Sequence, residues 1–234
     1  MGGNSVVCRP FSLPAPIGAL AWNLRANTPA KTGTCARRKP DRARQLRGMA
    51  EARGEKFTST AMDVTDPRSV REAAHQLHGT PIDLLINNAG TAGASGQTTG
   101  NLDYENWTHV FEVNTLGPMR VVEAFAGLVA HSERRLIVTI TSSMGSITEN
   151  TSGGSIAYRT SKAAVNMAMR SAAAELGARG ITCVVIHPGW VRTDMGGSSA
   201  PLTPEQSVTA MRGVIARLGP RDSGKFFNYD GSPW

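Results

Sequence analysis

The chain has 234 residues, of which 40% are hydrophobic and 18% charged, and its length suits one globular domain with a full core. No apolar stretch approaches the roughly 20 residues needed to cross a bilayer, and the start, MGGNSVVCRP, lacks the basic and apolar segments of a signal peptide. The three cysteines, Cys8, Cys35 and Cys183, have no metal-ligand spacing, which indicates a reduced cytoplasmic protein without a metal site.

The formal net charge of +7 is concentrated in the first quarter of the chain. Residues 1–60 hold 11 Lys/Arg and 3 Asp/Glu, whereas residues 61–234 hold 14 and 15. A basic arm that binds nucleic acid would have a steeply salt-dependent affinity, but this segment has few aromatic side chains to stack on bases. We therefore expect neither a nucleic-acid partner nor a membrane partner.

Residues 1–40 show no regular pattern. The stretch PFSLPAP holds three prolines in seven residues, and proline removes a hydrogen-bond donor from a helix interior or a strand ladder. No glycine-rich turn joins a first strand to a first helix in this segment. We treat residues 1–40 as an anomalous N-terminal part of a single domain that covers residues 1–234.

From residue 41 onward, helical and strand patterns alternate. We predict helices over 41–53, 66–77, 103–131, 157–178 and 204–218, and strands over 57–64, 82–87, 135–141, 181–187 and 224–229. Continuous apolar runs such as IDLLIN are typical of strands that are buried on both faces. The alternation predicts an α/β fold, in which a Rossmann-like doubly wound parallel sheet forms the middle of a three-layer α/β/α arrangement.

Polar residues follow three of the predicted strands, where ligands bind in open α/β sheets. These polar residues stand in short segments: Asn87, Asn88, Ala89 and Gly90 after the strand residues 82–86, Ser142, Ser143 and Gly145 after 135–141, and Pro188, Gly189 and Thr193 after 181–187. Tyr158 and Lys162 are four residues apart on the helix after the serines, so their side chains share one face. We expect all of these groups to lie at one rim of the sheet.

The residue types at this rim suit proton transfer to a carbonyl oxygen. A tyrosine hydroxyl has a pKa of about 10, and a nearby lysine ammonium lowers that pKa. A serine hydroxyl can hold the carbonyl oxygen while the tyrosine donates its proton, and a hydride must then come from a cofactor. Each feature alone has an ordinary structural explanation: a helical turn, a serine turn, or a core hydrogen bond for Asn114. Their order on consecutive strand ends favours the catalytic interpretation.

The chain resembles the short-chain dehydrogenase/reductase family through six motifs, and its carbonyl reductase subgroup most of all. They are DVTD (63–66), NNAG (87–90), VNTLGP (113–118), TSSMG (141–145), YRTSK (158–162) and HPGWVRTDM (187–195). The resemblance implies Tyr158 as acid/base, Ser142 as the substrate-orienting hydroxyl and Lys162 as the group that lowers the tyrosine pKa and holds the nicotinamide ribose. It implies that Asn114 anchors a relay water through a helix irregularity. It further implies cofactor contacts from Asp63, Val64, the 87–90 motif, Pro188, Gly189, Val191 and Thr193.

Two features depart from this family pattern. The family serine usually lies 13 residues before the tyrosine, but position 145 is Gly. Ser142 fits the SxxG pattern, and Ser143 is the alternative. The family also carries TGxxxGxG between its first strand and first helix, where backbone N–H groups contact the pyrophosphate, and that motif is absent here.

We hypothesise that a shifted reading frame explains the missing motif. If each codon over residues 12–34 begins on the preceding third base, Ala15, Ala19 and Ala21 can become glycines with GxxxGxG spacing. One consistent choice of codons reads ITGAHRGIGLELARQYAGEDWHV, an ordinary strand, phosphate loop and helix. A genuinely divergent N-terminus is the alternative.

Weaker features of the sequence indicate the cofactor type and the partners. Arg37 and Arg38 lie near the end of the anomalous segment, with no acidic residue between them and Asp41, which favours NADP, with NAD possible. We expect a small-molecule carbonyl or alcohol substrate, and the Ala-rich helix at 157–178 is compatible with a homodimer or homotetramer. The alternative function is a non-catalytic interaction or signalling protein with the same fold.

Overall fold

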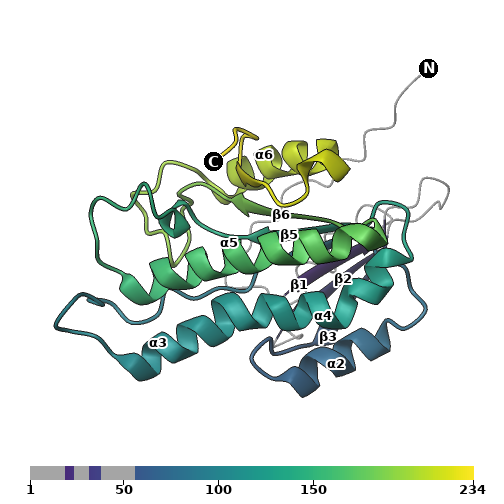
Figure 1. Ribbon diagram of the computed structural model, residues 1–234, viewed down its shortest axis with the longest axis horizontal. Helices are drawn as coiled ribbons and strands as arrows, with labels where there is room; N and C mark the ends of the chain where they lie inside the picture. The colour runs from purple at the N-terminus through teal and green to yellow at the C-terminus, as the bar shows by residue number, and fades with distance from the viewer. Residues whose placement is uncertain (1–18, 24–31, 38–55) are drawn as a thin grey trace.

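The computed structural model describes residues 19–23, 32–37 and 56–234. These residues form a seven-stranded sheet in the order β3-β2-β1-β4-β5-β6-β7. The strands are β1 (Ala19–Asn23), β2 (Thr32–Arg37), β3 (Lys56–Ala61), β4 (Leu84–Asn87), β5 (Leu136–Ile140), β6 (Thr182–His187) and β7 (Phe226–Asn228). The sheet and its covering helices confirm the predicted α/β class (Figure 1). The helix expected over 41–53 lies outside the described residues.

Strands β1 and β2 lie within residues 1–40, where the sequence predicted no regular element, so that expectation was wrong. In addition, β1 runs against the parallel direction predicted for the sheet. The pairs β2–β3, β4–β5, β5–β6 and β6–β7 are parallel, whereas β1 is antiparallel to both β2 and β4. The connection from β1 to β2 explains the first of these pairings, because only residues 24–31 separate the two strands. A parallel pair needs a crossover of a dozen or more residues, whereas a short connection returns the chain as an antiparallel neighbour.

The described helices begin close to the residues that the sequence suggested. They are α2 (Pro67–Gln76), α3 (Tyr104–Phe111), α4 (Gly117–Ala130), α5 (Ile156–Leu176) and α6 (Pro204–Arg217). Asp66 caps α2 by accepting a hydrogen bond from the Arg68 N–H, and Thr203 with Gln206 forms a capping box at α6. Among the described residues, no helix has the length and apolar character required to cross a membrane.

The long helix predicted over 103–131 is interrupted in the middle. Residues Glu112–Leu116 form a π-helical turn, η2, between α3 and α4. A π-helical turn is rare and often marks a functional position in a helix. Asn114 lies in this turn, so the helix irregularity expected at this residue is confirmed.

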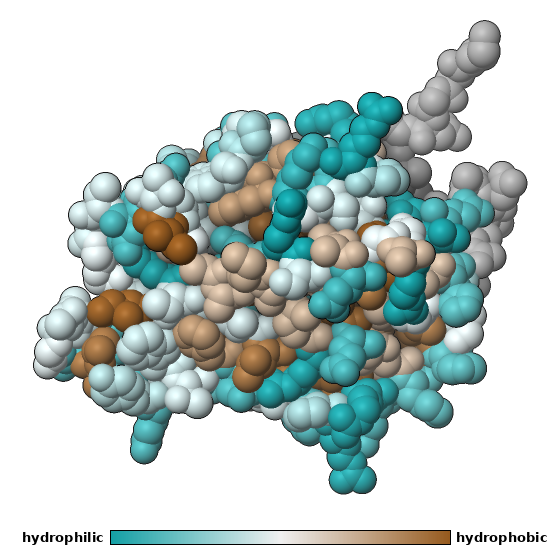
Figure 2. All heavy atoms as spheres, viewed as in Figure 1, coloured by the Kyte–Doolittle hydropathy of each residue, from teal (hydrophilic) through white to brown (hydrophobic). Residues whose placement is uncertain are grey.

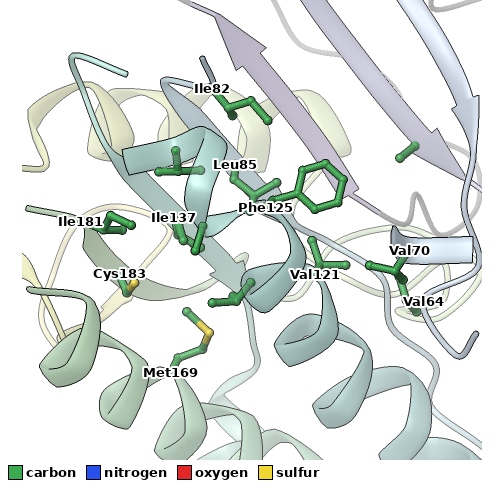
Figure 3. Close-up of a cluster of buried hydrophobic side chains, with 14 of the residues drawn as sticks. Val64, Val70, Ile82, Leu85, Val121, Phe125, Ile137, Met169, Ile181 and Cys183 are labelled. Atoms are coloured by element: carbon green, nitrogen blue, oxygen red, sulfur yellow. The ribbon is translucent and has the colours of Figure 1, made fainter. Parts of the chain in front are cut away.

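Two hydrophobic clusters hold the layers together. On one face of the sheet, Leu85 and Ile137 pack with residues of α2, α4 and α5, including Phe125 (Figure 3). On the other face, Leu136 and Val138 pack with residues of α6. Burying a side chain of this size stabilises the fold by roughly 1.5–3 kcal/mol. Because β4, β5 and β6 are fixed from both faces, their carboxyl ends lie side by side at one edge of the sheet.

Candidate active site

The serine and the tyrosine predicted from the sequence meet at this edge. Ser142 follows β5 and caps a short 3₁₀ turn, η3 (Ser143–Gly145), where its Oγ accepts a hydrogen bond from the Met144 N–H at 3.2 Å. Tyr158 is the third residue of α5. The Ser142 side chain lies close enough to the phenol of Tyr158 to lower its pKa. The structure therefore pairs Tyr158 with Ser142, the first of the two serines considered.

Close packing explains why position 145 carries no side chain. A Cβ at Gly145 would lie 2.8 Å from the carbonyl carbon of Lys162, 2.9 Å from Nδ2 of Asn166 and 3.0 Å from the backbone nitrogen of Ala163. Two of these atoms belong to the backbone of α5, which cannot move aside easily. Glycine at this position thus lets the serine turn approach the helix that carries Tyr158.

Lys162 lies inside the protein beside Tyr158. Its side chain is only 4% exposed, and its Nζ donates a hydrogen bond to the Ile140 carbonyl at 3.1 Å. The same nitrogen lies 5.7 Å from the centre of the Tyr158 ring. Burial lowers the pKa of Lys162 to about 8, because the ammonium loses its hydration. The ammonium form still predominates at neutral pH.

The direction of the Tyr158 shift differs from the sequence expectation. Burial raises the pKa of Tyr158 above its ordinary value, and the nearby Ser142 side chain lowers it by less. The expected decrease assumed that the charge of Lys162 would dominate, but removing the phenolate from water costs more free energy. The phenol therefore stays protonated at neutral pH, which is the form required of a proton donor.

Asn114 connects two segments of the site. Its Oδ1 accepts a hydrogen bond from the Thr91 N–H at 2.8 Å, while its Nδ2 donates to the Thr91 carbonyl and to Ser161 Oγ, both at 2.9 Å. Ser161 in turn donates to the Tyr158 carbonyl at 2.8 Å. The side chain of Asn114 thus ties the loop after β4 to the helix of Tyr158.

Gly90 follows β4 and lies next to two of these polar groups. A Cβ at Gly90 would lie 3.6 Å from both Asn114 Oδ1 and Lys162 Nζ. Because Gly90 has no side chain, only its backbone faces Asn114 Oδ1 and Lys162 Nζ. This leaves the space that a sugar hydroxyl needs to approach these two atoms closely. This part of the site fits the ribose end of a nicotinamide nucleotide.

The neighbours of Gly90 in the NNAG motif are more enclosed. The buried Asn87 amide donates to the Pro118 carbonyl at 3.5 Å and to Thr139 Oγ1 at 3.2 Å, while Asn87 Oδ1 has no hydrogen-bond partner among the described residues. Ala89 packs against the hydrophobic cluster of the α4 and α5 face. Asn88 is half-buried between them. This motif fixes the end of β4 against β5 and α4.

The residues expected at the adenosine end lie after β3. Asp63 Oδ1 accepts hydrogen bonds from the N–H and hydroxyl of Thr65 at 2.9 and 2.7 Å. Val64 is buried against Gly117, where a Cβ would lie 2.8 Å from Val64 Cγ2. Arg37 is the last residue of β2, but its side chain lies outside the described residues, as does Arg38. The first 18 residues and the 24–31 connection also lie outside them, so the geometry supports the ribose end only.

The segment after β6 is held from two sides. The Pro188 carbonyl accepts a hydrogen bond from Ser207 Oγ at 2.6 Å. Gly189 has a φ of 81°, and a Cβ there would lie 2.4 Å from Leu202 Cδ1. Val191 pairs with Leu202 in an isolated bridge. Thr193 is exposed and accepts a hydrogen bond from the Gly196 N–H at 3.1 Å.

Sequence reasoning missed two polar residues that organise the site. Ser161 is fully buried and bonds both Asn114 and Tyr158, and Thr115 Oγ1 donates to the Ser161 carbonyl at 3.0 Å. Polar residues on the inward face of an apolar helix are the signal that could have revealed them. Both residues connect the π-helical turn to α5.

Known proteins resemble this chain in sequence and in structure. The family model for short chain dehydrogenases matches residues 17–202. The C-signal protein of Myxococcus xanthus is 46% identical over 156 residues, covering 66% of this chain and 93% of that protein. The carbonyl reductase Sniffer of D. melanogaster superposes with a TM-score of 0.78 at 33% identity, covering 88% of this chain and 90% of that chain. An NADPH-bound carbonyl reductase from chicken fatty liver gives a TM-score of 0.77 at 32% identity, covering 86% of each chain.

Proposed function

The chain belongs to the short-chain dehydrogenase family and is an oxidoreductase of that family, and we propose that it reduces the carbonyl group of a small molecule with NADPH. The observation that carries this proposal is the placement of the Tyr158 phenol next to the Ser142 side chain and 5.7 Å, measured to its ring centre, from the buried Lys162 Nζ. The structural relatives support it, because one is a carbonyl reductase with bound NADPH.

The site supports a simple division of roles. A bound NADPH would supply the hydride for the carbonyl carbon. Ser142 Oγ and Tyr158 Oη hold the carbonyl oxygen, and Tyr158 transfers its proton to that oxygen as negative charge develops there. The ammonium of Lys162 stabilises the phenolate that remains. The product is an alcohol. Asn114 holds the loop after β4 in place beside these groups.

Several residues are proposed to hold the cofactor. Lys162 and the 87–90 motif would contact the nicotinamide ribose, while Pro188, Gly189, Val191 and Thr193 would line the nicotinamide. Asp63 and Val64 would contact the adenosine end, and Arg37 would pair with the 2′-phosphate. This assignment favours NADPH over NADH, because an arginine binds the additional phosphate through charge and hydrogen bonds.

The test is NADPH consumption with a panel of aldehydes, ketones and quinones at millimolar cofactor. Tyr158→Phe removes the proton donor and should lower kcat by about 10²–10⁴-fold. Tyr104→Phe is the matched control, since Tyr104 is 69% exposed on α3 and should leave kcat unchanged. Equal activity of the Tyr158→Phe and wild-type proteins would contradict the proposed mechanism.

The non-catalytic alternative is not favoured. This alternative rested on the missing phosphate motif. The close placement of Ser142, Tyr158, Lys162 and Asn114 supports catalysis instead. A protein that had lost catalysis would have no need for an ammonium buried at this cost.

Assembly and location are further parts of the proposal. Apolar side chains gather over α4 and α5 on one face (Figure 2). Met167 of α5 is 67% exposed, and Leu116 of the π-helical turn before α4 is 43% exposed. We propose that this face forms a homodimer or homotetramer contact, which sedimentation of the wild type and Met167→Lys would test. The buried free thiol of Cys183 supports a cytoplasmic location.

A further inference from the structure

The helix that carries Tyr158 begins without the usual cap. Its N-cap residue, Ser155, has left-handed backbone angles with φ of 44°, and its side chain caps nothing. Gly153 and Gly154 before it also have positive φ values of 63° and 66°. A serine at an ordinary N-cap would accept a bond from the first turn. Another group must therefore fix the entry of α5, only three residues before the catalytic phenol.

Arg159 makes the contacts that fix this entry. Its Nε donates to the carbonyls of Gly153 and Gly154 at 3.1 and 3.2 Å, and its Nη2 donates to Ser152 Oγ at 2.9 Å. One rigid guanidinium thus binds three consecutive residues of the incoming chain. These contacts hold residues 152–154 against the first turn of the helix.

The position of this cation is electrostatically unfavourable. The N-terminus of a helix carries partial positive charge, so a cation in the first turn costs about 0.3–1 kcal/mol. No acidic residue lies in the first turn of α5 to offset the charge. The hydrogen bonds to residues 152–154 are the compensation that the structure shows.

Side-chain packing contributes little to holding this segment. Gly153, Gly154, Ile156 and Arg159 line an open pocket of about 410 Å³. Thr98, Thr99, Asn150 and Thr160 complete its lining. The glycines have no side chains to pack and one side is open, so hydrogen bonds hold this segment. The Gly153 N–H donates to Asn150 Oδ1 at 3.1 Å and the Ile156 N–H donates to the Gln97 carbonyl at 3.1 Å, while Arg159 makes the side-chain contacts from α5 to residues 152–154.

We propose that Arg159 is a positioning residue for the reductase: it clamps residues 152–154 and thereby holds the first turn of α5 so that Tyr158 Oη stays within reach of Ser142. This inference rests on the proposed function. Proton transfer is sensitive to small displacements of the donor, because a misplacement of about 1 Å can cost 10²-fold in rate. Arg159 itself contacts no reacting atom.

The experiment compares Arg159→Ala with Arg170→Ala. Arg170 is the matched control, because it lies on the same helix and its Nη1 also donates to a glycine carbonyl, that of Gly224, at 3.0 Å. Arg159→Ala should lower kcat by about 10–100-fold with KM for NADPH within about twofold, and Arg170→Ala should leave both unchanged. Arg159→Lys should recover part of kcat, and millimolar methylguanidinium should partly restore Arg159→Ala.

Amide hydrogen exchange provides a readout that does not depend on catalysis. Residues 153–160 should exchange faster in Arg159→Ala than in the wild type or in Arg170→Ala. If the wild type is active but both alanine variants have the same kcat and the same exchange, the inference is overturned. If the wild type reduces no carbonyl compound, the proposed function fails, and the exchange of residues 153–160 alone decides whether Arg159 is the clamp.

Discussion

The two halves of the sheet contribute to the site in different ways. Strands β4 to β7 are parallel and bring Ser142, Tyr158, Lys162 and Asn114 to one edge. On the other side, β1 is antiparallel and enters the sheet between β2 and β4. The proton-transfer groups therefore come from segments between β4 and β6, and none of them lies in β1, β2 or β3.

The register of β1 shows what its direction changes. Ala19 pairs with Asn87 and Trp22 with Leu84, so β1 ends at the edge where β4 begins. In a sheet that binds dinucleotides, the turn after the first strand meets the pyrophosphate at the carboxyl edge. The carboxyl end of β1, at Asn23, lies at the opposite edge. The catalytic half thus has the parallel strands of a dinucleotide-binding sheet, whereas β1 has the reverse direction. The predictions below test that difference.

The largest expected effect comes from replacing the N-terminal segment. Exchanging residues 12–34 for ITGAHRGIGLELARQYAGEDWHV supplies the glycine turn and helix N-terminus that donate backbone N–H groups to the pyrophosphate. We expect the Kd for NADPH to fall at least about 100-fold, since several charge-assisted hydrogen bonds are gained. Isothermal titration measures it. Micromolar or tighter binding by the unaltered chain would show that the N-terminal half already binds phosphate.

The coding DNA gives an independent check of the reading-frame hypothesis. We expect a one-base insertion or deletion near codons 8–12, compensated near codons 35–40, relative to genes of intact relatives. An uninterrupted frame with the same length as in those relatives would leave a divergent N-terminus as the explanation.

A second prediction tests how tightly the catalytic half is packed. Gly145→Ala places a methyl group against the backbone of α5 and should lower the free energy of unfolding by about 1–3 kcal/mol. The control is Gly127→Ala in α4, where a Cβ meets nothing within 4 Å and should stabilise the helix by about 0.5–1 kcal/mol. Urea denaturation measures both free energies of unfolding. A Gly145→Ala protein as stable as the Gly127→Ala protein would contradict close packing at Gly145.

A third prediction concerns the cost of the buried ammonium. Lowering the pKa of Lys162 from 10.5 to about 8 corresponds to about 3 kcal/mol of lost stability at neutral pH. Lys162→Met should raise the free energy of unfolding at pH 7 by about 1–3 kcal/mol, less the lost bond to Ile140, while abolishing reduction. Lys225→Met, at an exposed lysine paired with Asp222, should change stability by under about 0.5 kcal/mol.

The sign of the pH dependence follows from the same shift. Between pH 8 and 10.5 the unfolded chain holds a proton that folded Lys162 has released, so wild-type stability should rise with pH across this window. The stability of Lys162→Met should lack this rise. Denaturation at pH 7 and pH 9.5 measures the difference, and parallel curves for the two proteins would place Lys162 in water.

The smallest effect is expected in the pH profile of catalysis. Because kcat/KM reports the free enzyme, it should fall as pH rises through about 8, where Lys162 loses its charge. Tyr158 stays protonated across this range, since burial raises its pKa. A reduction rate that increases between pH 8 and 10 would show that Lys162 does not act as an ammonium.

The sequence by itself determined the order of the motifs and most elements from residue 56 onward, but not β1 and β2. Apolar periodicity, the Asp66 cap and the spacing of Tyr158 and Lys162 are local properties of the chain, so they predicted helices, strands and one shared helix face. Sequence also placed a serine at the end of β5 and an irregularity at Asn114. It could not choose between Ser142 and Ser143.

Only the tertiary structure decided the features that depend on distant neighbours. The pairing of Ser142 with Tyr158, the upward shift of the Tyr158 pKa and the clamp by Arg159 arise where separate segments meet. The direction of β1 depends on its pairing with β2 and β4. Burial and strand pairing are set by residues far apart in the chain, and no local pattern encodes how much water they exclude.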